Sequence, residues 1–435
     1  MSENKHFKVL RYILAVFFAA AFWSAAQSYA WPPGFVDVSD VIPEAELDIR
    51  YYGDHNFIGA RVKSYEAPIA ILSVEAAAAL KNAARILGCA GYGIKIYDAY
   101  RPAGAVDHFV RWSKDPDDVK MKEIFYPDTD KADLFRKGYI ATKSRHSRGG
   151  TVDLTITDAR AGHDIDMGSS FDFFGEISHF DSKRVTGEQS ANRQILRDAM
   201  VQAGFAPLRN EWWHFALKDE PYPKTYFDFP VAPPQAVDAD TRAMLESASR
   251  GVDKVITVSP LKEYGNTAVI RAYRKDGADW TLRFETSGYL GKNGVSAEKR
   301  EGDGKTPSGV YTFGRAFGVS DDPGSATPYV KVTENDVWVD DPNSARDNQW
   351  AGKDAPDADW KSAEHLIKFP KAYKYAIAIN YNTNPAVPGL GSAIFIHCST
   401  GGPTAGCVSV PEAAMIFFLS FIDGGTRIKI QDTRP

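Results

Sequence analysis

The chain has 435 residues, more than the roughly 250 at which a single core stops growing, so two domains are expected. Its 44% hydrophobic and 25% charged residues are typical of soluble globular domains and do not indicate extended disorder. The formal net charge of -5, without a long Lys/Arg cluster, argues against a nucleic-acid partner.

The first 30 residues differ from the rest of the chain. Lys5, Lys8 and Arg11 precede an apolar run at 13–26, and a Ser-Tyr-Ala sequence follows it. This pattern predicts a signal peptide at 1–30 and therefore an exported protein of the periplasm or cell envelope. An uncleaved membrane anchor is the alternative, although the run is shorter than the roughly 20 residues of a spanning helix. After cleavage, no membrane span is expected.

The next 200 residues mix helix and strand patterns. The Ala- and Leu-rich segment 73–87 predicts a helix, and the alternating segment 93–97 predicts a strand. We expect an α+β domain at 31–230. The composition then shifts to Pro and Ala around 229–239, which favours a linker, placed at 231–250.

The last part of the chain is punctuated by Gly-rich turns, and its regular segments are short and rich in β-formers. We expect a mainly β domain at 251–435. Its clearest predicted strands lie at 254–258, 267–273, 280–285 and 393–397.

Two short segments of the first domain carry residues suited to a metal. His146 and Asp153 lie seven positions apart across a Gly-containing turn, and Glu211 precedes His214 by three positions. Three protein ligands with a fourth position left open are the arrangement of catalytic zinc. We therefore predict one Zn²⁺ ion bound by His146, Asp153 and His214.

The expected chemistry of this site is amide hydrolysis. Zinc lowers the pKa of its water towards about 7, so that a neighbouring carboxylate, here Glu211, can act as the general base. The developing oxyanion requires a further positive donor, and Arg101 is the best candidate. Asp98, three residues earlier, is expected to hold the guanidinium in place.

The two segments together resemble a known family. Ser144-x-His146-x6-Asp153 and Glu211-x-x-His214 resemble the signatures of the D-alanyl-D-alanine dipeptidases, zinc metallopeptidases that include vancomycin-resistance dipeptidases. The resemblance covers roughly residues 35–225, and it implies the same zinc ligands and the same base.

The resemblance also implies the parts of the site that bind substrate. Arg101 corresponds to the family's transition-state stabiliser. Asp172, at the end of the motif 166–172, and Ser144 would bind the free ammonium of the dipeptide. From the residues alone, Asp172 is equally well interpreted as a cap of a helix or turn. An internal peptide has no charge to satisfy such a carboxylate, so the expected substrate is D-Ala-D-Ala.

The second domain contains a candidate thiol site. His397 ends an apolar run, and Cys407 follows ten positions later across a turn with Gly401, Gly402 and Gly406. Thiol catalysis needs a thiolate and an imidazole that lowers its pKa and then protonates the leaving amine. Backbone amides of the turn are candidates for stabilising an oxyanion.

Three cysteines are too few for a disulfide scaffold. A disulfide between Cys398 and Cys407 is a competing interpretation of the same segment, and the pair of His397 and Cys407 can also be purely structural. An odd count leaves at least one thiol free.

A second resemblance favours catalysis. Residues 254–433 resemble the L,D-transpeptidase catalytic domain of peptidoglycan synthesis, through the segments 302–311 and 338–344, His397, and the Thr-x-Gly-Cys sequence that ends at Cys407. The resemblance implies attack of Cys407 on a peptidoglycan stem peptide to give an acyl-enzyme.

One position departs from the pattern. Many members of the family have His two residues before the nucleophile, where this chain has Ala405. The departure leaves the fold expected and puts turnover and acceptor choice in question.

The leading hypothesis is an exported bifunctional peptidoglycan enzyme, a zinc dipeptidase joined to a thiol L,D-transpeptidase. One alternative is a zinc dipeptidase or carboxypeptidase of broader specificity with a hydrolytic or inactive second domain. Another is a non-catalytic wall-binding protein. The expected partners are D-Ala-D-Ala and peptidoglycan stem peptides, and no cofactor besides zinc is expected.

Overall fold

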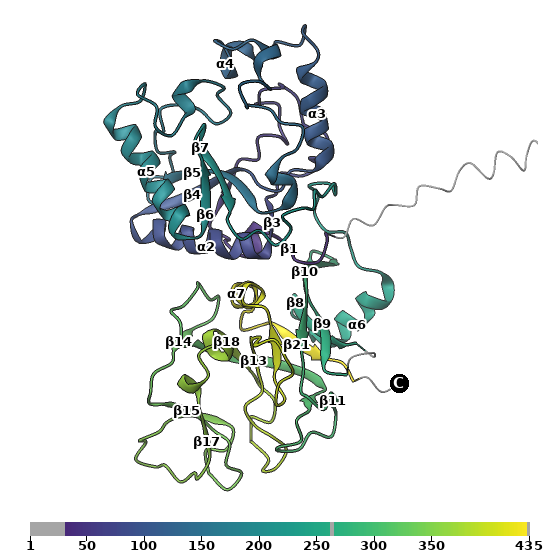
Figure 1. The fold of residues 1–435 in the computed structure, drawn as a ribbon. Helices are drawn as coiled ribbons and strands as arrows, with labels where there is room; N and C mark the ends of the chain where they lie inside the picture. The colour runs from purple at the N-terminus through teal and green to yellow at the C-terminus, as the bar shows by residue number, and fades with distance from the viewer. Residues whose placement is uncertain (1–30, 262–264, 433–435) are drawn as a thin grey trace, which may run out of the picture.

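The computed structural model describes residues 31–261 and 265–432, which form two lobes stacked end to end (Figure 1). The predicted signal peptide lies outside these residues. Within the described part of the chain, no helix has the length and apolar character needed to cross a bilayer.

A five-stranded sheet forms the centre of the first lobe and carries the candidate metal ligands. Its strands, in spatial order, are β2 (Glu46–Leu47), β4 (Tyr92–Asp98), β5 (Thr151–Asp158), β7 (Glu211–Leu217) and β6 (Phe205–Leu208). A separate two-stranded sheet pairs β1 (Phe35–Asp37) with β3 (Ile71–Ser73). The helices are α2 (Val74–Cys89), α3 (Ala103–Ser113), α4 (Lys122–Phe125) and α5 (Gly187–Gln202).

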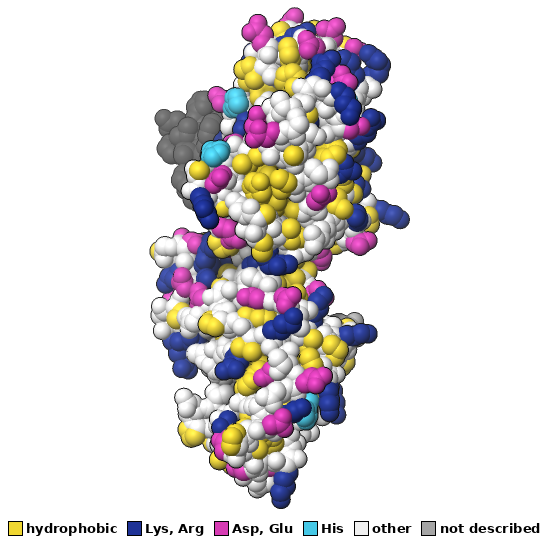
Figure 2. Space-filling view, turned by 90° about the vertical axis from the view of Figure 1, so that its left-hand side faces the viewer, with side chains coloured by type: hydrophobic (Ala, Val, Ile, Leu, Met, Phe, Trp, Pro, Cys, Tyr) yellow, Lys and Arg dark blue, Asp and Glu magenta, His cyan; other side chains and the backbone are white. Residues whose placement is uncertain are grey.

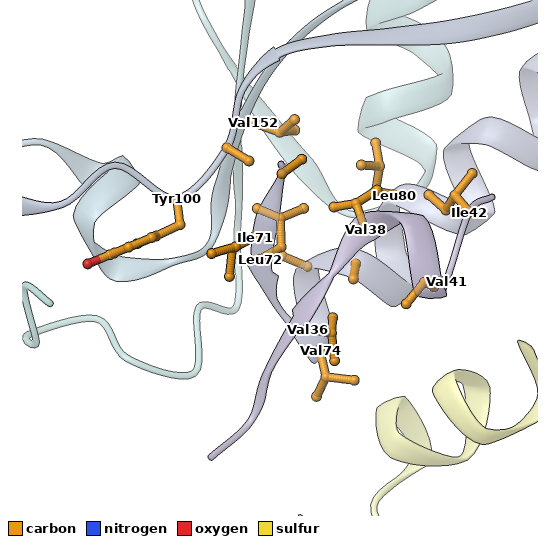
Figure 3. Close-up of a cluster of buried hydrophobic side chains, with 14 of the residues drawn as sticks. Val36, Val38, Val41, Ile42, Ile71, Leu72, Val74, Leu80, Tyr100 and Val152 are labelled. Carbon is orange, nitrogen blue, oxygen red and sulfur yellow. The ribbon is translucent and has the colours of Figure 1, made fainter. Parts of the chain in front are cut away.

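Helix α2 confirms the helix predicted at 73–87. Ser73 is its N-cap, and the Ser73 hydroxyl accepts a hydrogen bond from the Ala76 amide. The buried face of the helix includes Leu80, which packs into the cluster of branched side chains beneath the sheet, next to Val38 and Ile42 (Figure 3). Helix α2 also packs against β4, the strand that follows it in the chain.

The second lobe is mainly β, as predicted. Its nine-stranded sheet is closed by an additional pairing between β13 and β21. The strands, in spatial order, are β14 (Tyr329–Lys331), β13 (Gly309–Gly318), β18 (Ala376–Ile379), β19 (Phe395–Cys398), β20 (Val408–Val410), β10 (Asp279–Tyr289), β9 (Thr267–Asp276), β8 (Lys254–Pro260) and β21 (Arg427–Ile430).

Shorter elements complete this lobe. They are the pair β11 (Val295–Ser296) and β12 (Thr306–Pro307), the three-stranded sheet of β16 (Gln349–Gly352), β15 (Asp336–Val339) and β17 (Ala363–His365), and the helix α7 (Glu412–Phe421). The architecture is therefore an α+β domain followed by a mainly β domain.

The segment 231–250, expected to be a linker, is in fact largely structured. It contains helix α6 (Ala239–Ser249), whose N-cap Asp238 accepts a hydrogen bond from the Thr241 amide. Leu245 of this helix is buried against Trp280 in the second lobe. The beginning of the segment belongs to the first lobe instead, because Val231 forms a bridge with Tyr65. The change of domain is thus confined to a few residues.

The two lobes meet through an ion cluster that we call the interdomain ion cluster, formed by Asp37, Asp40, Arg274 and Arg283. Arg283 Nε donates to Asp40 Oδ2 at 2.6 Å, and its Nη2 donates to Asp37 Oδ2 at 3.2 Å. Arg274 pairs with the other oxygen of Asp40. Both carboxylates come from the first lobe and both guanidinium groups from the second, so the cluster joins the lobes.

A buried lysine adds to this interface. Lys81 of α2 donates through Nζ to the Val41 carbonyl in its own lobe, and to the Gly324 carbonyl and the Ser420 hydroxyl in the second lobe. On the face of the molecule shown in Figure 2, by contrast, charged side chains of both signs are intermixed over both lobes.

Candidate functional site

Three neighbouring strands bring the polar residues of the first domain into one row. Asp98 on β4 is the register partner of Asp153 on β5, and Asp153 is in turn the partner of His214 on β7. Side chains at paired positions lie on the same face of a sheet. Asp98, Asp153 and His214 therefore form a continuous row across the sheet.

His146 approaches this row from a short 3-10 helix at Arg145–Arg148. Ser144 caps the helix, and its hydroxyl accepts a hydrogen bond from the His146 amide at 3.3 Å. The helix ends at Gly149, which has φ of +77°; a Cβ there would lie 2.3 Å from Cε1 of Phe35. Only glycine fits this turn. His146 Nδ1 contacts the Ala99 carbonyl at 2.7 Å, which directs Nε2 towards the row.

The three predicted ligands converge on one point. His146 Nε2 lies 3.3 Å from both Asp153 Oδ2 and His214 Nδ1, and His214 Nδ1 lies 3.0 Å from Asp153 Oδ1. One ligand atom from each residue falls within 4.8 Å of the others. Asp153 Oδ1 is buried and forms no hydrogen bond of acceptable geometry. Two nitrogens and a carboxylate oxygen arranged in this way fit the ligand set of zinc.

The two histidines stabilise the negative charge of Asp153. Burial opposes ionisation of Asp153, but His146 and His214 outweigh it, so the pKa of this carboxyl is lowered. The Asp153 carboxylate is therefore ionised at neutral pH and available as a ligand.

Arg101 lies where it was predicted, beside the centre. Its Nε donates to Asp98 Oδ2 at 2.9 Å, and its Nη2 lies 3.5 Å from Asp153 Oδ2. The guanidinium carbon sits 4.9 Å from the ring centroid of Tyr51. The other carboxylate oxygen of Asp98, Oδ1, accepts a hydrogen bond from the Tyr65 hydroxyl at 2.6 Å. Asp98 thus orients Arg101, as the spacing of the two residues suggested.

Glu211 is the carboxylate best suited to accept a proton. It begins β7, and its Oε2 lies 3.6 Å from His214 Nδ1. Burial raises the pKa of Glu211 to about 7, against the opposing charges of His214 and Arg101. A carboxylate whose pKa lies near the working pH is well matched to general-base chemistry.

The centre opens into a cavity of about 210 Å³ lined by residues that include Ser144, Asp172, Arg101 and Glu211. Asp172 is only 7% exposed and adopts a left-handed backbone conformation with φ of +60°. Its Oδ2 accepts a hydrogen bond from the Tyr51 hydroxyl at 2.8 Å, and burial raises its pKa. Without a cationic partner, a carboxyl buried in this way favours its neutral form.

Three residues that support this site were not singled out from the sequence. Tyr51 and Tyr65 hold the two aspartates described above. Glu220 accepts hydrogen bonds from Arg145 and Arg148, the two arginines that flank His146, and so ties the 3-10 helix to the chain just after β7. Only long-range contacts reveal these roles, and the sequence contains no local signal for them.

The candidate thiol of the second domain lies beside β19. Cys407 Sγ accepts a hydrogen bond from the Phe395 amide and donates to the Ala393 carbonyl, both at 3.3 Å. His397 is two residues beyond Phe395, so both side chains lie on the same face of the strand. The structure thus brings Cys407 to the strand that carries His397. No hydrogen bond joins the two side chains among the described residues.

The electrostatics of this pair differ from the expectation of a lowered thiol pKa. Burial raises the pKa of Cys407 to about 12, and burial also lowers the pKa of His397. Both groups are therefore neutral near pH 7. His397 Nδ1 contacts the Cys398 carbonyl at 2.8 Å. If that nitrogen carries the proton, Nε2 is free to accept one.

The competing disulfide is absent, because Cys89, Cys398 and Cys407 are all free thiols in the structure. Tyr373 is a further neighbour that the sequence did not indicate. Its ring packs edge-on against His397 with centroids 5.5 Å apart, and its hydroxyl donates to Glu364 at 2.5 Å.

Two imidazoles and a carboxylate, with a second carboxylate and an arginine beside them, have the composition of a metal-dependent hydrolytic site. Comparison with known families agrees. Residues 32–232 match the family model described as D-Ala-D-Ala dipeptidase, and residues 253–430 match the L,D-transpeptidase catalytic domain. The chain belongs to the D-alanyl-D-alanine dipeptidase family, which is zinc-dependent, and carries an L,D-transpeptidase domain behind the dipeptidase domain.

Curated relatives support the first assignment. The chain is 42% identical over 199 residues to the D-alanyl-D-alanine dipeptidase of Enterococcus faecalis, covering 46% of this chain and 98% of the relative. It is 41% identical over 198 residues to that of Streptomyces coelicolor, with the same coverage. The Escherichia coli dipeptidase is 31% identical over 182 residues, covering 42% of this chain and 83% of the relative.

Solved structures match less closely. An L,D-transpeptidase from Mycobacterium smegmatis is 10% identical with a TM-score of 0.15, covering 46% of this chain and 88% of that one. Bd1075 of Bdellovibrio bacteriovorus is 19% identical with a TM-score of 0.23, covering 42% of this chain and 48% of that one. The assignment of the second domain therefore rests on the family match.

Proposed function

We propose that the protein is an exported bifunctional enzyme of peptidoglycan metabolism. Its first domain hydrolyses D-alanyl-D-alanine with zinc bound by His146, Asp153 and His214. Its second domain transfers acyl groups from peptidoglycan stem peptides through a Cys407 thioester. Export is proposed from the N-terminal signal pattern, and peptidoglycan is the context that both domain families share.

The roles in the first domain follow from position. Asp172, with Ser144, binds the ammonium of the dipeptide and so places its amide beside the metal centre. A bound zinc ion would polarise the amide carbonyl and acidify a water. Glu211 accepts the proton of the attacking water and returns it to the leaving amine. Arg101, oriented by Asp98, donates to the oxyanion.

In the second domain, the reaction starts with both Cys407 and His397 uncharged. His397 accepts the Cys407 proton as the sulfur attacks the carbonyl carbon of the stem peptide, and then gives that proton to the leaving amine. Because the resting thiol is protonated, the proton transfer accompanies the attack. An amine or a water then resolves the thioester.

The observation that carries the proposal is the convergence of the three ligand atoms beside Glu211 and Arg101 in one small cavity. A protein that only binds the cell wall has no use for a buried carboxylate of raised pKa beside a metal site.

The first test supplies D-Ala-D-Ala, L-Ala-L-Ala and a tetrapeptide stem to the purified protein. We expect cleavage of D-Ala-D-Ala, with Glu211→Ala retaining zinc while its rate falls by about 10²- to 10⁴-fold. Equal cleavage of both dipeptides would contradict the narrow specificity. Retained hydrolysis in Glu211→Ala would show that another group is the base.

The second test probes the thiol separately. Incubation with a carbapenem followed by intact-mass measurement should show an adduct on the native protein and none on Cys407→Ala. An unmodified native protein would indicate that the second domain is inactive, and would leave the proposal for the zinc site standing.

A further inference from the structure

The two reacting groups of the thiol site are not held by a bond to each other. Cys407 Sγ is hydrogen-bonded to the backbone at Phe395 and Ala393. Among the described residues, no hydrogen bond joins it to the imidazole of His397. His397 Nδ1 contacts the Cys398 carbonyl at 2.8 Å, which fixes one edge of the imidazole. Another neighbour must therefore fix the plane of this ring if Nε2 is to accept the thiol proton.

Tyr373 is the neighbour that lies against the His397 ring. The two rings are perpendicular, at 88°, and their centroids are 5.5 Å apart. Tyr373 is 5% exposed and belongs, with Phe395 and Cys407, to one cluster of buried side chains. Because side chains in such a cluster are closely packed, a phenol ring in this edge-on position restricts rotation of the imidazole.

Tyr373 itself lies in a short and irregular part of the backbone. The segment Ala372–Lys374 is a three-residue 3-10 turn, in which Tyr373 has a non-helical φ of -97° and ψ of 28°. The far end of the side chain is held by Glu364, whose Oε1 accepts a hydrogen bond from the Tyr373 hydroxyl at 2.5 Å. The position of the phenol ring therefore depends on Glu364.

The three-stranded sheet of the second lobe places Glu364. This residue lies on β17 and is the register partner of Trp338 on β15. Residues paired in this way lie on the same face of a sheet, and the Trp338 ring packs against that of Phe395 with centroids 4.9 Å apart. Phe395 carries the amide that donates to Cys407 Sγ. One face of this sheet thus packs beside the thiol and supplies the carboxylate that holds Tyr373.

We propose that Glu364 and Tyr373 are positioning residues of the thiol site. The Glu364 carboxylate fixes the phenol of Tyr373, and the phenol holds the imidazole of His397 in the orientation in which Nε2 receives the Cys407 proton. The assignment rests on the thiol activity proposed above. Neither positioning residue exchanges a proton with the substrate, and both act through His397.

The charge of Glu364 has a second effect, which distinguishes it from a purely steric support. Burial raises the pKa of the Cys407 thiol, the Glu364 charge raises it further, and Lys299 opposes them. Burial also raises the pKa of Glu364, and the charge of Asp340 adds to this shift while the hydrogen bond from the phenol opposes it. A substitution that removes the Glu364 charge but keeps an acceptor for the phenol should therefore make the thiol easier to ionise without moving the imidazole.

The test compares two reactions of Cys407 in the full-length protein, followed by mass measurement of the Cys407 peptide. Acylation by a carbapenem at pH 7 requires the imidazole to take the thiol proton. Alkylation by iodoacetamide at pH 10 uses thiolate formed by exchange with the solvent and requires no base in the site. Tyr373→Phe keeps the ring but loses the bond to Glu364. Its acylation should be slower by roughly tenfold, and its alkylation should change by less than about twofold.

Matched variants separate the hydrogen bond from the charge. Tyr329→Phe loses a hydroxyl bonded to the Ser320 carbonyl in the same lobe and should change neither rate. Glu364→Ala should slow acylation as much as Tyr373→Phe, and the double variant should be no slower than either, because all three lose the same bond. Glu364→Gln keeps an acceptor and should restore acylation, while its alkylation should become faster because the negative charge is gone.

The possible outcomes distinguish this proposal from the thiol activity on which it rests. Wild-type acylation in Tyr373→Phe would refute the positioning role and leave the thiol activity standing. Equal losses in both reactions would also refute it, because Tyr373 would then support the fold of the lobe and not the imidazole in particular. Additive losses in the double variant would refute the link through Glu364. If the native protein forms no carbapenem adduct, the thiol activity fails and the positioning role fails with it.

Discussion

Removing Arg283 should weaken the whole molecule through the interdomain ion cluster. In Arg283→Met the carboxylate of Asp37 loses its ion-pair partner, and Asp40 keeps only Arg274. The side chains of Arg283, Asp37 and Asp40 are 5%, 8% and 1% exposed, so water cannot replace the lost contact. Breaking a buried pair costs about 3–5 kcal/mol, and the remaining Arg274 contact places the expected loss near 3 kcal/mol.

Urea unfolding followed by tryptophan fluorescence measures this loss. Arg271→Met is the matched control, because Arg271 is 34% exposed and pairs with Glu285 within the second lobe. Its expected cost is about 0–1 kcal/mol. If Arg283→Met costs no more than the control, the cluster does not hold the lobes together and the reasoning from burial is wrong.

Three further predictions concern the two sites. Glu220→Gln should speed the loss of zinc to a chelator by roughly tenfold, because Arg145 and Arg148, on either side of the ligand His146, lose the carboxylate that they bind. An unchanged rate would show that Glu220 does not position His146. The Cys407 thiol has a pKa of about 12, so its alkylation rate should still rise between pH 7 and pH 10; a plateau near neutrality would contradict the neutral pair. Gly149→Ala should lower the free energy of unfolding by more than Gly162→Ala, since both have positive φ but only the former meets a neighbour, the Phe35 ring; equal losses by roughly 1–2 kcal/mol would remove the steric argument.

Much of the metal site was predictable because its residues are close in sequence. Glu211 and His214 lie on one strand, and His146 and Asp153 lie on one turn and the strand after it. What brings the two segments together is the register of Asp153 opposite His214, which depends on pairing across 61 positions. The resemblance to a family supplied that link; local patterns do not.

The failures have a common physical origin in tertiary packing. Helix α6 was not predicted within the Pro- and Ala-rich segment, because its burial against Trp280 is not visible in the local sequence. The raised pKa of Cys407 depends on burial, which spacing cannot reveal. Asp37 and Arg283 are 246 residues apart, so their contact has no local signal.

The most direct test of the zinc site is a titration of D-Ala-D-Ala hydrolysis against bound zinc. Metal is removed with a chelator and returned in steps while zinc content and initial rate are measured on the same samples. We predict a rate that is absent in the metal-free protein, rises in proportion to bound zinc and saturates at about one ion per chain. Full hydrolysis without zinc, or saturation only at about two ions per chain, would contradict a mononuclear site of His146, Asp153 and His214.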